Sequence, residues 1–146
     1  MASLGTSLND SNISILVNNA LSSGALPTDA NGVYFVLYVA ETSGFLTQYC
    51  GWHMYNFSGS TAIKFAFVGN AAANMSACSE QSTSPNGDAE ADAMASVIAH
   101  ELEESTTDPQ LNAWHDSTGA ENAPGRSAPS TRLPMDPRRN DDGDIA

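Results

Sequence analysis

Basic residues are scarce in this chain of 146 residues, which has 5 Lys and Arg against 17 Asp and Glu and a net charge of −12. Thirteen of the acids and one base, Lys64, precede residue 126, so this part of the chain carries the whole imbalance. Such an acidic surface repels nucleic acid and anionic membranes, and both are excluded as partners. It suits a cation site or an acidic extracellular setting, and it also occurs simply as a soluble surface.

The sequence also lacks long apolar runs. No stretch of eighteen apolar residues occurs, so a transmembrane helix is not expected. The opening "MASLGTSLNDSN" has neither a basic region nor an apolar one behind it, so it is not read as a signal peptide. Secretion is nevertheless weakly favoured by four Asn-x-Ser glycosylation sequons, at Asn9, Asn12, Asn56 and Asn74. The two cysteines, Cys50 and Cys78, form either one disulfide or two free thiols, because spacing does not decide.

Hydrophobic periodicity and turn residues predict one α+β domain. The expected elements are a helix over 10–22, strands over 32–40, 45–57 and 62–69, a loop over 70–87 and a helix from 88 to 106. The turn at 58–60 makes the second and third strands an antiparallel hairpin. The first strand is expected to be buried on both faces, because it is apolar throughout.

Caps and an apolar stripe define the two predicted helices. Asp10 or Ser11 is expected to cap the first, and Asn86 or Asp88 the second. The buried stripe of the long helix is predicted to consist of Met94, Val97, Ile98 and Leu102. From residue 124 the chain is rich in Pro, Arg and Asp and has no aromatic residue, so 124–146 is predicted to be a disordered tail.

The long helix contains His-Glu-x-x-Glu, in the stretch "SVIAHELEESTTDP". His100 and Glu104 are four residues apart, so they share a helix face and could bind one metal ion. Imidazole and carboxylate are both ordinary zinc ligands, and Glu101 is placed as the general base of His-Glu-x-x-His enzymes. The motif is weak by itself, because glutamate is common in helices. An exposed acidic turn with no function is the competing interpretation.

A catalytic zinc site needs a third protein ligand. The stretch after the helix offers His115, Asp116 and Glu121. His53, in "CGWHMYNF", alternates with Trp52 and Met54 and is interpreted as a partly exposed strand residue rather than a ligand.

Four stretches follow one another along the chain: "QYCGWHMYNF", "KFAFVGN", "PNGDAEADAMASVIAHELEESTTDPQLNAW" and "GAEN". Together they resemble the phosphate-induced protein 1 family, also called Exordium-like, in a form similar to those of oomycetes and other microbes. The resemblance spans residues 7–123 and implies a partial domain of that family over 1–123. It implies a secreted protein of the apoplast or cell wall. It also implies a zincin-like subdomain, in which a small mixed sheet with a hairpin packs against the first helix and the long helix.

The resemblance places His100, Glu101 and Glu104 on a helix similar to that of zinc peptidases, and it makes Glu121 the preferred third ligand, above Asp116. The chain departs from the family pattern in its missing signal peptide, in its tail from residue 124 and in having fewer cysteines.

Three functions follow as hypotheses. The first is a secreted zinc-dependent, peptidase-like hydrolase, with Glu101 as base and zinc on His100, Glu104 and Glu121. The second is a non-catalytic extracellular protein that acts in growth or host interaction by binding a peptide or a cell-wall component. The third is a truncated gene product without a function of its own.

Overall fold

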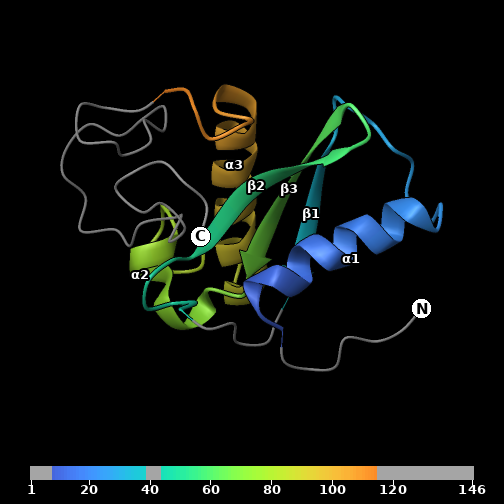
Figure 1. Cartoon of the computed structure of the whole chain (residues 1–146). Coiled ribbons are helices and arrows are strands. Elements are labelled where there is room, and N and C mark those ends of the chain that lie inside the picture. Colours follow the sequence, from blue (N-terminus) through green and yellow to red (C-terminus); the bar gives the residue numbers. More distant parts are fainter. Residues whose placement is uncertain (1–7, 39–43, 115–146) are drawn as a thin grey trace.

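A computed structural model describes residues 8–38 and 44–114 (Figure 1). Its elements are α1 (Asp10–Ser22), β1 (Val33–Tyr38), β2 (Gly51–Ser58), β3 (Thr61–Gly69), η1 (Ala72–Asn74), α2 (Met75–Cys78) and α3 (Ala89–Thr107). The three strands form one mixed sheet in the order β1-β3-β2, with β1 parallel and β2 antiparallel to β3. The predicted α+β class is confirmed. The predicted tail, 124–146, lies outside the described residues.

The first helix and the hairpin form where the sequence predicts them, with one change in the cap. The side chain of Asn9, rather than Asp10 or Ser11, accepts a hydrogen bond from the N–H of Asn12, and the side chain of Asn12 accepts one from the N–H of Asn9. This reciprocal pair satisfies two N–H groups near the start of the helix. None of the described helices combines the length and apolarity that crossing a bilayer requires.

The second strand begins at Gly51, later than the predicted 45. The segment before it turns instead, because the carbonyl of Gly44 accepts hydrogen bonds from the N–H groups of Thr47, Gln48 and Tyr49. Gly44 has a φ of 93°, a conformation that favours glycine, so this turn competes locally with an extended strand.

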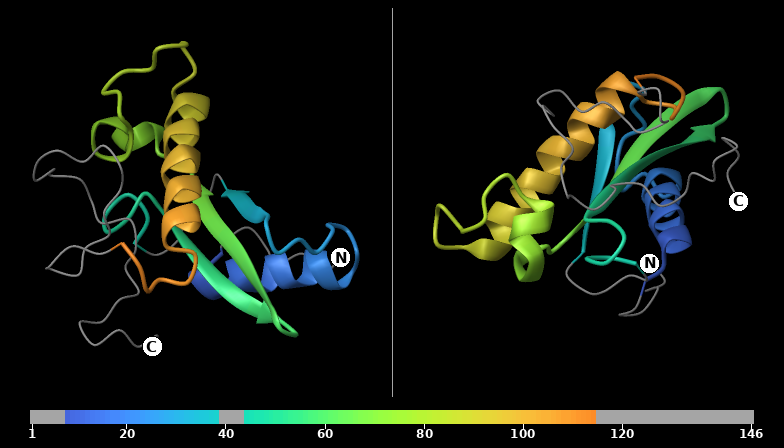
Figure 2. Two further views of the ribbon diagram at one scale, coloured as in Figure 1. Left: turned by 90° about the horizontal axis from the view of Figure 1, so that it is seen from above. Right: turned by 90° about the vertical axis from the view of Figure 1, so that its left-hand side faces the viewer.

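Helices cover both faces of the sheet, with α1 on one side and α3 on the other (Figures 1 and 2). Because side chains alternate along a strand, each face has its own composition. On the α1 face the core is aromatic and aliphatic, with Trp52 packed against Phe65 and Phe67, and with Ile13 and Val17 also buried. Burial of each such side chain contributes about 2 kcal/mol to stability.

The α3 face is made of smaller and more polar residues. Gly51, His53 and Ala66 point toward α3, and an added Cβ at Gly51 would lie 2.5 Å from Val97 Cγ1 and 2.8 Å from Glu101 Oε1. Glycine is therefore required at this position for α3 to approach β2 so closely. The result is a narrow space in which polar side chains of the helix can reach the strand.

The buried side of α3 differs from the predicted apolar stripe. Val97 is buried as expected, but Leu102 is 46% exposed, and Met94 and Ile98 are only partly buried. The interior positions are taken by Asp92, Ala93, Val97, Glu101, Glu104 and Ser105. The stripe was misplaced because an apolar pattern alone cannot show that two glutamates point into the protein.

The segment before α3, predicted as a loop, holds η1, α2 and a disulfide. Cys50 and Cys78 are bonded, which ties the residue before β2 to the end of α2. Asp88 caps α3 by accepting a hydrogen bond from the N–H of Ala91. Asn86 instead donates to Asp92, together with the hydroxyl of Ser84. These hydrogen bonds, Ser84 first, lower the pKa of Asp92, so its carboxylate holds the loop against the helix.

The first strand was expected to be buried on both faces, and it is only half-buried, with Leu37 54% exposed. The reason is its position at the edge of the sheet, where it pairs with β3 alone among the described residues. An edge strand is left partly open on one side.

Candidate metal centre

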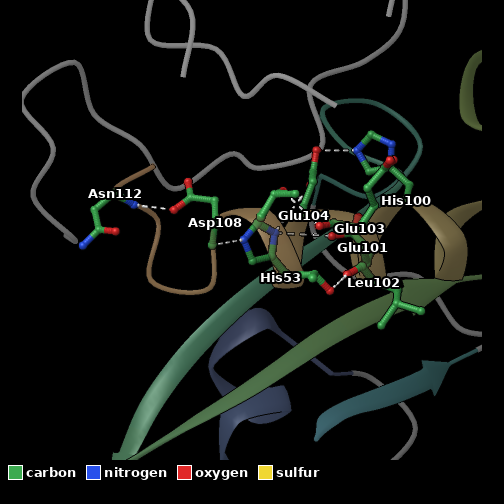
Figure 3. A network of polar contacts seen from close by, with 10 residues as sticks. His53, His100, Glu101, Leu102, Glu103, Glu104, Asp108 and Asn112 are labelled. Carbon is green, nitrogen blue, oxygen red and sulfur yellow. Dashed lines mark hydrogen bonds and ion pairs between the residues drawn. The ribbon is translucent and has the colours of Figure 1, made fainter. Parts of the chain in front are cut away.

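Three buried side chains converge in the space between β2 and α3 (Figure 3). His53 Nδ1 lies 3.7 Å from Glu101 Oε2 and 3.4 Å from Glu104 Oε2. One ligand atom from each of the three residues lies within 4.8 Å of the others, a spacing that could hold a metal ion. The three residues are called the His53 cluster below.

The two elements bring the cluster together for simple geometric reasons. His53 alternates with Trp52 and Met54 along β2, so when the two large apolar side chains face α1, the imidazole faces α3. Glu101 and Glu104 are three residues apart, so both lie on the side of α3 that faces the strand. Ala66, opposite His53 on β3, is small and leaves room for the ring.

The imidazole of His53 is held in one orientation by the end of α3. Its Nε2 lies 3.1 Å from the backbone carbonyl of Asp108. A carbonyl oxygen only accepts hydrogen bonds, so Nε2 carries the hydrogen. In the neutral ring Nδ1 then has its lone pair directed toward the two glutamates. Metal-binding histidines are commonly oriented in this way, with the second nitrogen donating to a carbonyl or carboxylate.

Asp108 is itself fixed, so the carbonyl is a rigid partner. The backbone N–H of Asp108 donates to the carbonyl of Glu104 at 2.7 Å. Its buried carboxylate accepts hydrogen bonds from the N–H groups of Asn112 and Ala113, at 2.6 and 2.8 Å. The residue that ends α3 thus also sets the tautomer of His53.

His100 lies beside the cluster and contacts one of its members. Its Nε2 is 2.6 Å from Glu104 Oε1, while the other oxygen of Glu104 faces His53. Glu104 therefore lies between two imidazoles. The predicted pairing of His100 with Glu104 along one helix face is present in the structure.

The two glutamates have opposite pKa shifts. Burial raises the pKa of Glu101 to about 7. Burial alone would also raise the pKa of Glu104, but the hydrogen bond from His100, and after it the contact with His53, lower it to about 2. At neutral pH the site therefore holds an ionised Glu104 and a Glu101 that is about half protonated, because two full negative charges would repel each other in the same buried space.

The donors of the cluster fit a zinc-type cation. Neither oxygen of Glu101 has a hydrogen-bond partner among the described residues, and the side chain is 0% exposed. Leaving such oxygens without a partner costs free energy, which a cation would offset. Imidazole nitrogen and carboxylate oxygen are also the ligand atoms that zinc accepts.

The residues predicted as the site have different outcomes. Glu101 and Glu104 belong to the cluster, and His100 lies at the edge of the cluster, in contact with Glu104. His115, Asp116 and Glu121 lie outside the described residues, so Glu121 as third ligand stays a prediction. His53 was expected to be partly exposed, and this is wrong, because its side chain is 1% exposed.

Sequence reasoning missed His53 because a single strand histidine carries no ligand spacing. The available signal was Gly51 two residues earlier, which leaves that face of the strand open.

In the metal-free protein, the contributions of the two glutamates to the free energy of unfolding change with pH in opposite directions. The folded pKa of Glu101 is raised from 4.5 to about 7, so its contribution is complete below pH 4.5 and is lost as pH rises through 7. The folded pKa of Glu104 is lowered from 4.5 to about 2, so its contribution is present above pH 4.5 and is lost as pH falls through 2. We expect the melting temperature in EDTA to be highest near pH 4.5 and to fall on both sides.

The control is Glu101→Gln, which should flatten the slope between pH 4.5 and 7 and leave the acid slope unchanged. An unchanged slope above pH 4.5 in this variant would show that another group is responsible.

Comparison with known proteins identifies relatives. The chain is 32% identical to the protein EXORDIUM-like 3 of Arabidopsis thaliana over 131 residues, which is 76% of this chain and 39% of the relative. It is 29% identical to EXORDIUM-like 5 of the same plant over 123 residues, covering 68% of this chain and 33% of the relative. The chain therefore spans less than half the length of these relatives.

No solved structure matches the chain. The family described as "Phosphate-induced protein 1 conserved region" matches residues 1–129. This match covers most of the chain. Together with the similarity to the Exordium-like relatives, it shows that the chain belongs to the phosphate-induced protein 1 family.

Proposed function

We propose that this chain is a zinc-binding domain of an extracellular protein, with His53, Glu101 and Glu104 as the ligands. The observation that carries the proposal is the convergence of three buried donors, one of which has its tautomer set by the Asp108 carbonyl. When bound, the ion would supply two positive charges to a layer that otherwise buries two carboxyl groups beside imidazoles. His100 would orient Glu104 from its other oxygen.

The extracellular setting is supported by the Cys50–Cys78 disulfide. Disulfides persist in oxidising compartments and are rare in the cytosol. The four glycosylation sequons agree with this setting, although they also arise by chance.

Burial favours a structural ion over a catalytic one. In the cluster, His53 is 1% exposed, Glu101 0% and Glu104 4%. Structural zinc sites are closed by the protein, whereas catalytic ones keep a position open to substrate. A role in stabilising the α3 side of the sheet is therefore the function that the geometry supports best.

Zinc-dependent peptide hydrolysis is the second candidate, and one observation favours it. Burial raises the pKa of Glu101 to about 7, which is near the value that suits a general base at neutral pH. In this candidate Glu101 accepts a proton during the reaction, His53 and Glu104 are ligands with Glu121 as the predicted third ligand, and His100 positions Glu104. Glu101 would then not be a ligand, and that difference is testable.

Metal analysis of the purified full chain tests both candidates. We expect one zinc per chain after dialysis, and a chain that binds no zinc would end the proposal. If Glu101 is a ligand, Glu101→Gln should weaken zinc binding about 100-fold or more, since even residues that only orient ligands contribute about 10–100-fold. If Glu101 is instead a base, the variant keeps its zinc and loses hydrolysis of peptide substrates. The matched control is Glu103→Gln, the same change on the same helix outside the cluster.

A further inference from the structure

A groove separate from the His53 cluster runs between β1 and α3. It has a volume of about 360 Å³ and is lined by Val33 and Phe35 of β1, Lys64 of β3, and Leu102, Ser105 and Thr106 of α3. The face of β1 that turns toward α3 continues with Leu37, because side chains two residues apart point the same way. Leu37 and Leu102 are 54% and 46% exposed, so the groove leaves apolar surface open to solvent.

Along Val33–Leu37, the edge of β1 that faces away from β3 has no strand partner among the described residues. Among the described residues β1 pairs with β3 alone, and no other described backbone segment hydrogen-bonds to it. An open strand edge offers backbone N–H and C=O groups at regular intervals, and extended peptides can add to such an edge as a further strand. Apolar side chains on alternate peptide residues would then fall between Phe35 and Leu102.

Charge marks one end of the groove. Lys64 is the one Lys or Arg of the described residues, which contain ten acids. It lies opposite Val33 in the sheet register, at the beginning of β1. Its Nζ donates to the carbonyl of Ala30 at 2.6 Å, which fixes the ammonium group there. A lysine ammonium has three donors, so the group can also bind a carboxylate.

We propose that the groove between β1 and α3 binds the C-terminal end of an extended partner peptide, which adds to β1 as an antiparallel strand. Antiparallel addition brings the C-terminus of the peptide to the beginning of β1, where Lys64 receives its carboxylate. Peptide residues farther from the C-terminus should be neutral or basic, because the rest of the domain is acidic.

The probe is a fluorescein-labelled peptide, Lys-Lys-Thr-Val-Thr-Val, with a free C-terminus, added to the full chain. We expect saturable binding below about 1 mM, and about fivefold weaker binding when the same peptide is C-terminally amidated, since one partly exposed ion pair contributes up to about a factor of five. Lys64→Gln should remove the difference between the two peptides, and Lys64→Arg should keep it. Equal binding of the two peptides to the unaltered chain, or no binding, overturns the proposal.

Two further measurements locate the bound peptide. Thr106→Arg, an exposed position in the groove, should block binding without disturbing the fold, which zinc affinity and circular dichroism check. Amide shifts in NMR spectra should be largest at Val33, Phe35 and Leu37. Shifts confined to another face, or a chain that dimerises through β1 and so occupies the groove with a second copy, would also contradict the proposal.

Discussion

Replacing His53 by alanine is expected to abolish zinc binding at micromolar metal, with an affinity loss of about 100-fold or more. His53 supplies the one nitrogen donor of the cluster, and its removal leaves Glu101 and Glu104 facing a space that a methyl group does not fill. Competition against a fluorescent zinc chelator at neutral pH measures the loss. Near-ultraviolet circular dichroism checks that Trp52, the neighbouring residue, keeps its environment in the variant.

His100→Ala tests whether the ion is bound by the His53 cluster or by the His-Glu-x-x-Glu motif of the helix. His100 contacts Glu104 from outside the cluster, so its loss should weaken zinc binding by about 10-fold, the effect of a residue that orients a ligand. The reverse order of effects, with His100 essential and His53 dispensable, would mean that the ion is held by the helix motif and a ligand outside the described residues. Glu121 would then be the residue to test next.

Gly51→Ala should strongly destabilise the sheet and its packing against α3. The new Cβ would lie 2.5 Å from Val97 Cγ1, 2.8 Å from Glu101 Oε1 and 2.9 Å from the carbonyl oxygen of Phe67. The first two contacts are with α3 and require the helix to move outward, and the last is backbone of β3 and cannot rotate away, so the pairing of β2 with β3 must also shift. We expect a loss of about 3 kcal/mol in the free energy of unfolding, measured by urea denaturation, and weaker zinc binding as Glu101 is displaced.

The matched control for this substitution is Gly32→Ala. An added Cβ at Gly32 meets its nearest neighbour, Asp29, at 3.5 Å, an ordinary contact. The same chemical change should therefore alter stability by less than about 0.5 kcal/mol. A comparable loss in both variants would show that the effect at Gly51 does not come from the close approach of α3.

Much of the fold could be predicted from the sequence, because local signals specify it. The helix over 10–22, the hairpin at 58–60 and the end of α3 near Asp108 follow from apolar spacing, a Gly-Ser turn and an Asp-Pro stop. The parallel pairing of β1 with β3 could not be predicted, since no local pattern reports which edge of a hairpin a distant strand joins. Nor could the side of α3 that faces inward, because its interior includes Glu101 and Glu104.

Two of the three residues of the His53 cluster were visible in the sequence. Glu104 stands out because it lies four residues after His100 on one helix face, and Glu101 because it occupies the general-base position of His-Glu-x-x-His. His53 is 48 residues before Glu101, and only the pairing of β2 with β3 and the packing of α3 bring it there. The same packing explains the Asp108 carbonyl, a backbone atom that no sequence motif can encode.

The contrast between the two faces of the sheet has a consequence for how the family can diverge. On the α1 face, Trp52, Phe65 and Phe67 contribute through volume and apolarity, so other large apolar residues can replace them in compensating combinations. On the α3 face, Gly51 is constrained by space, and His53 and Glu104 by the atoms they present to each other. Substitution should therefore be slow on one side of a three-stranded sheet and comparatively free on the other, although a helix covers each side.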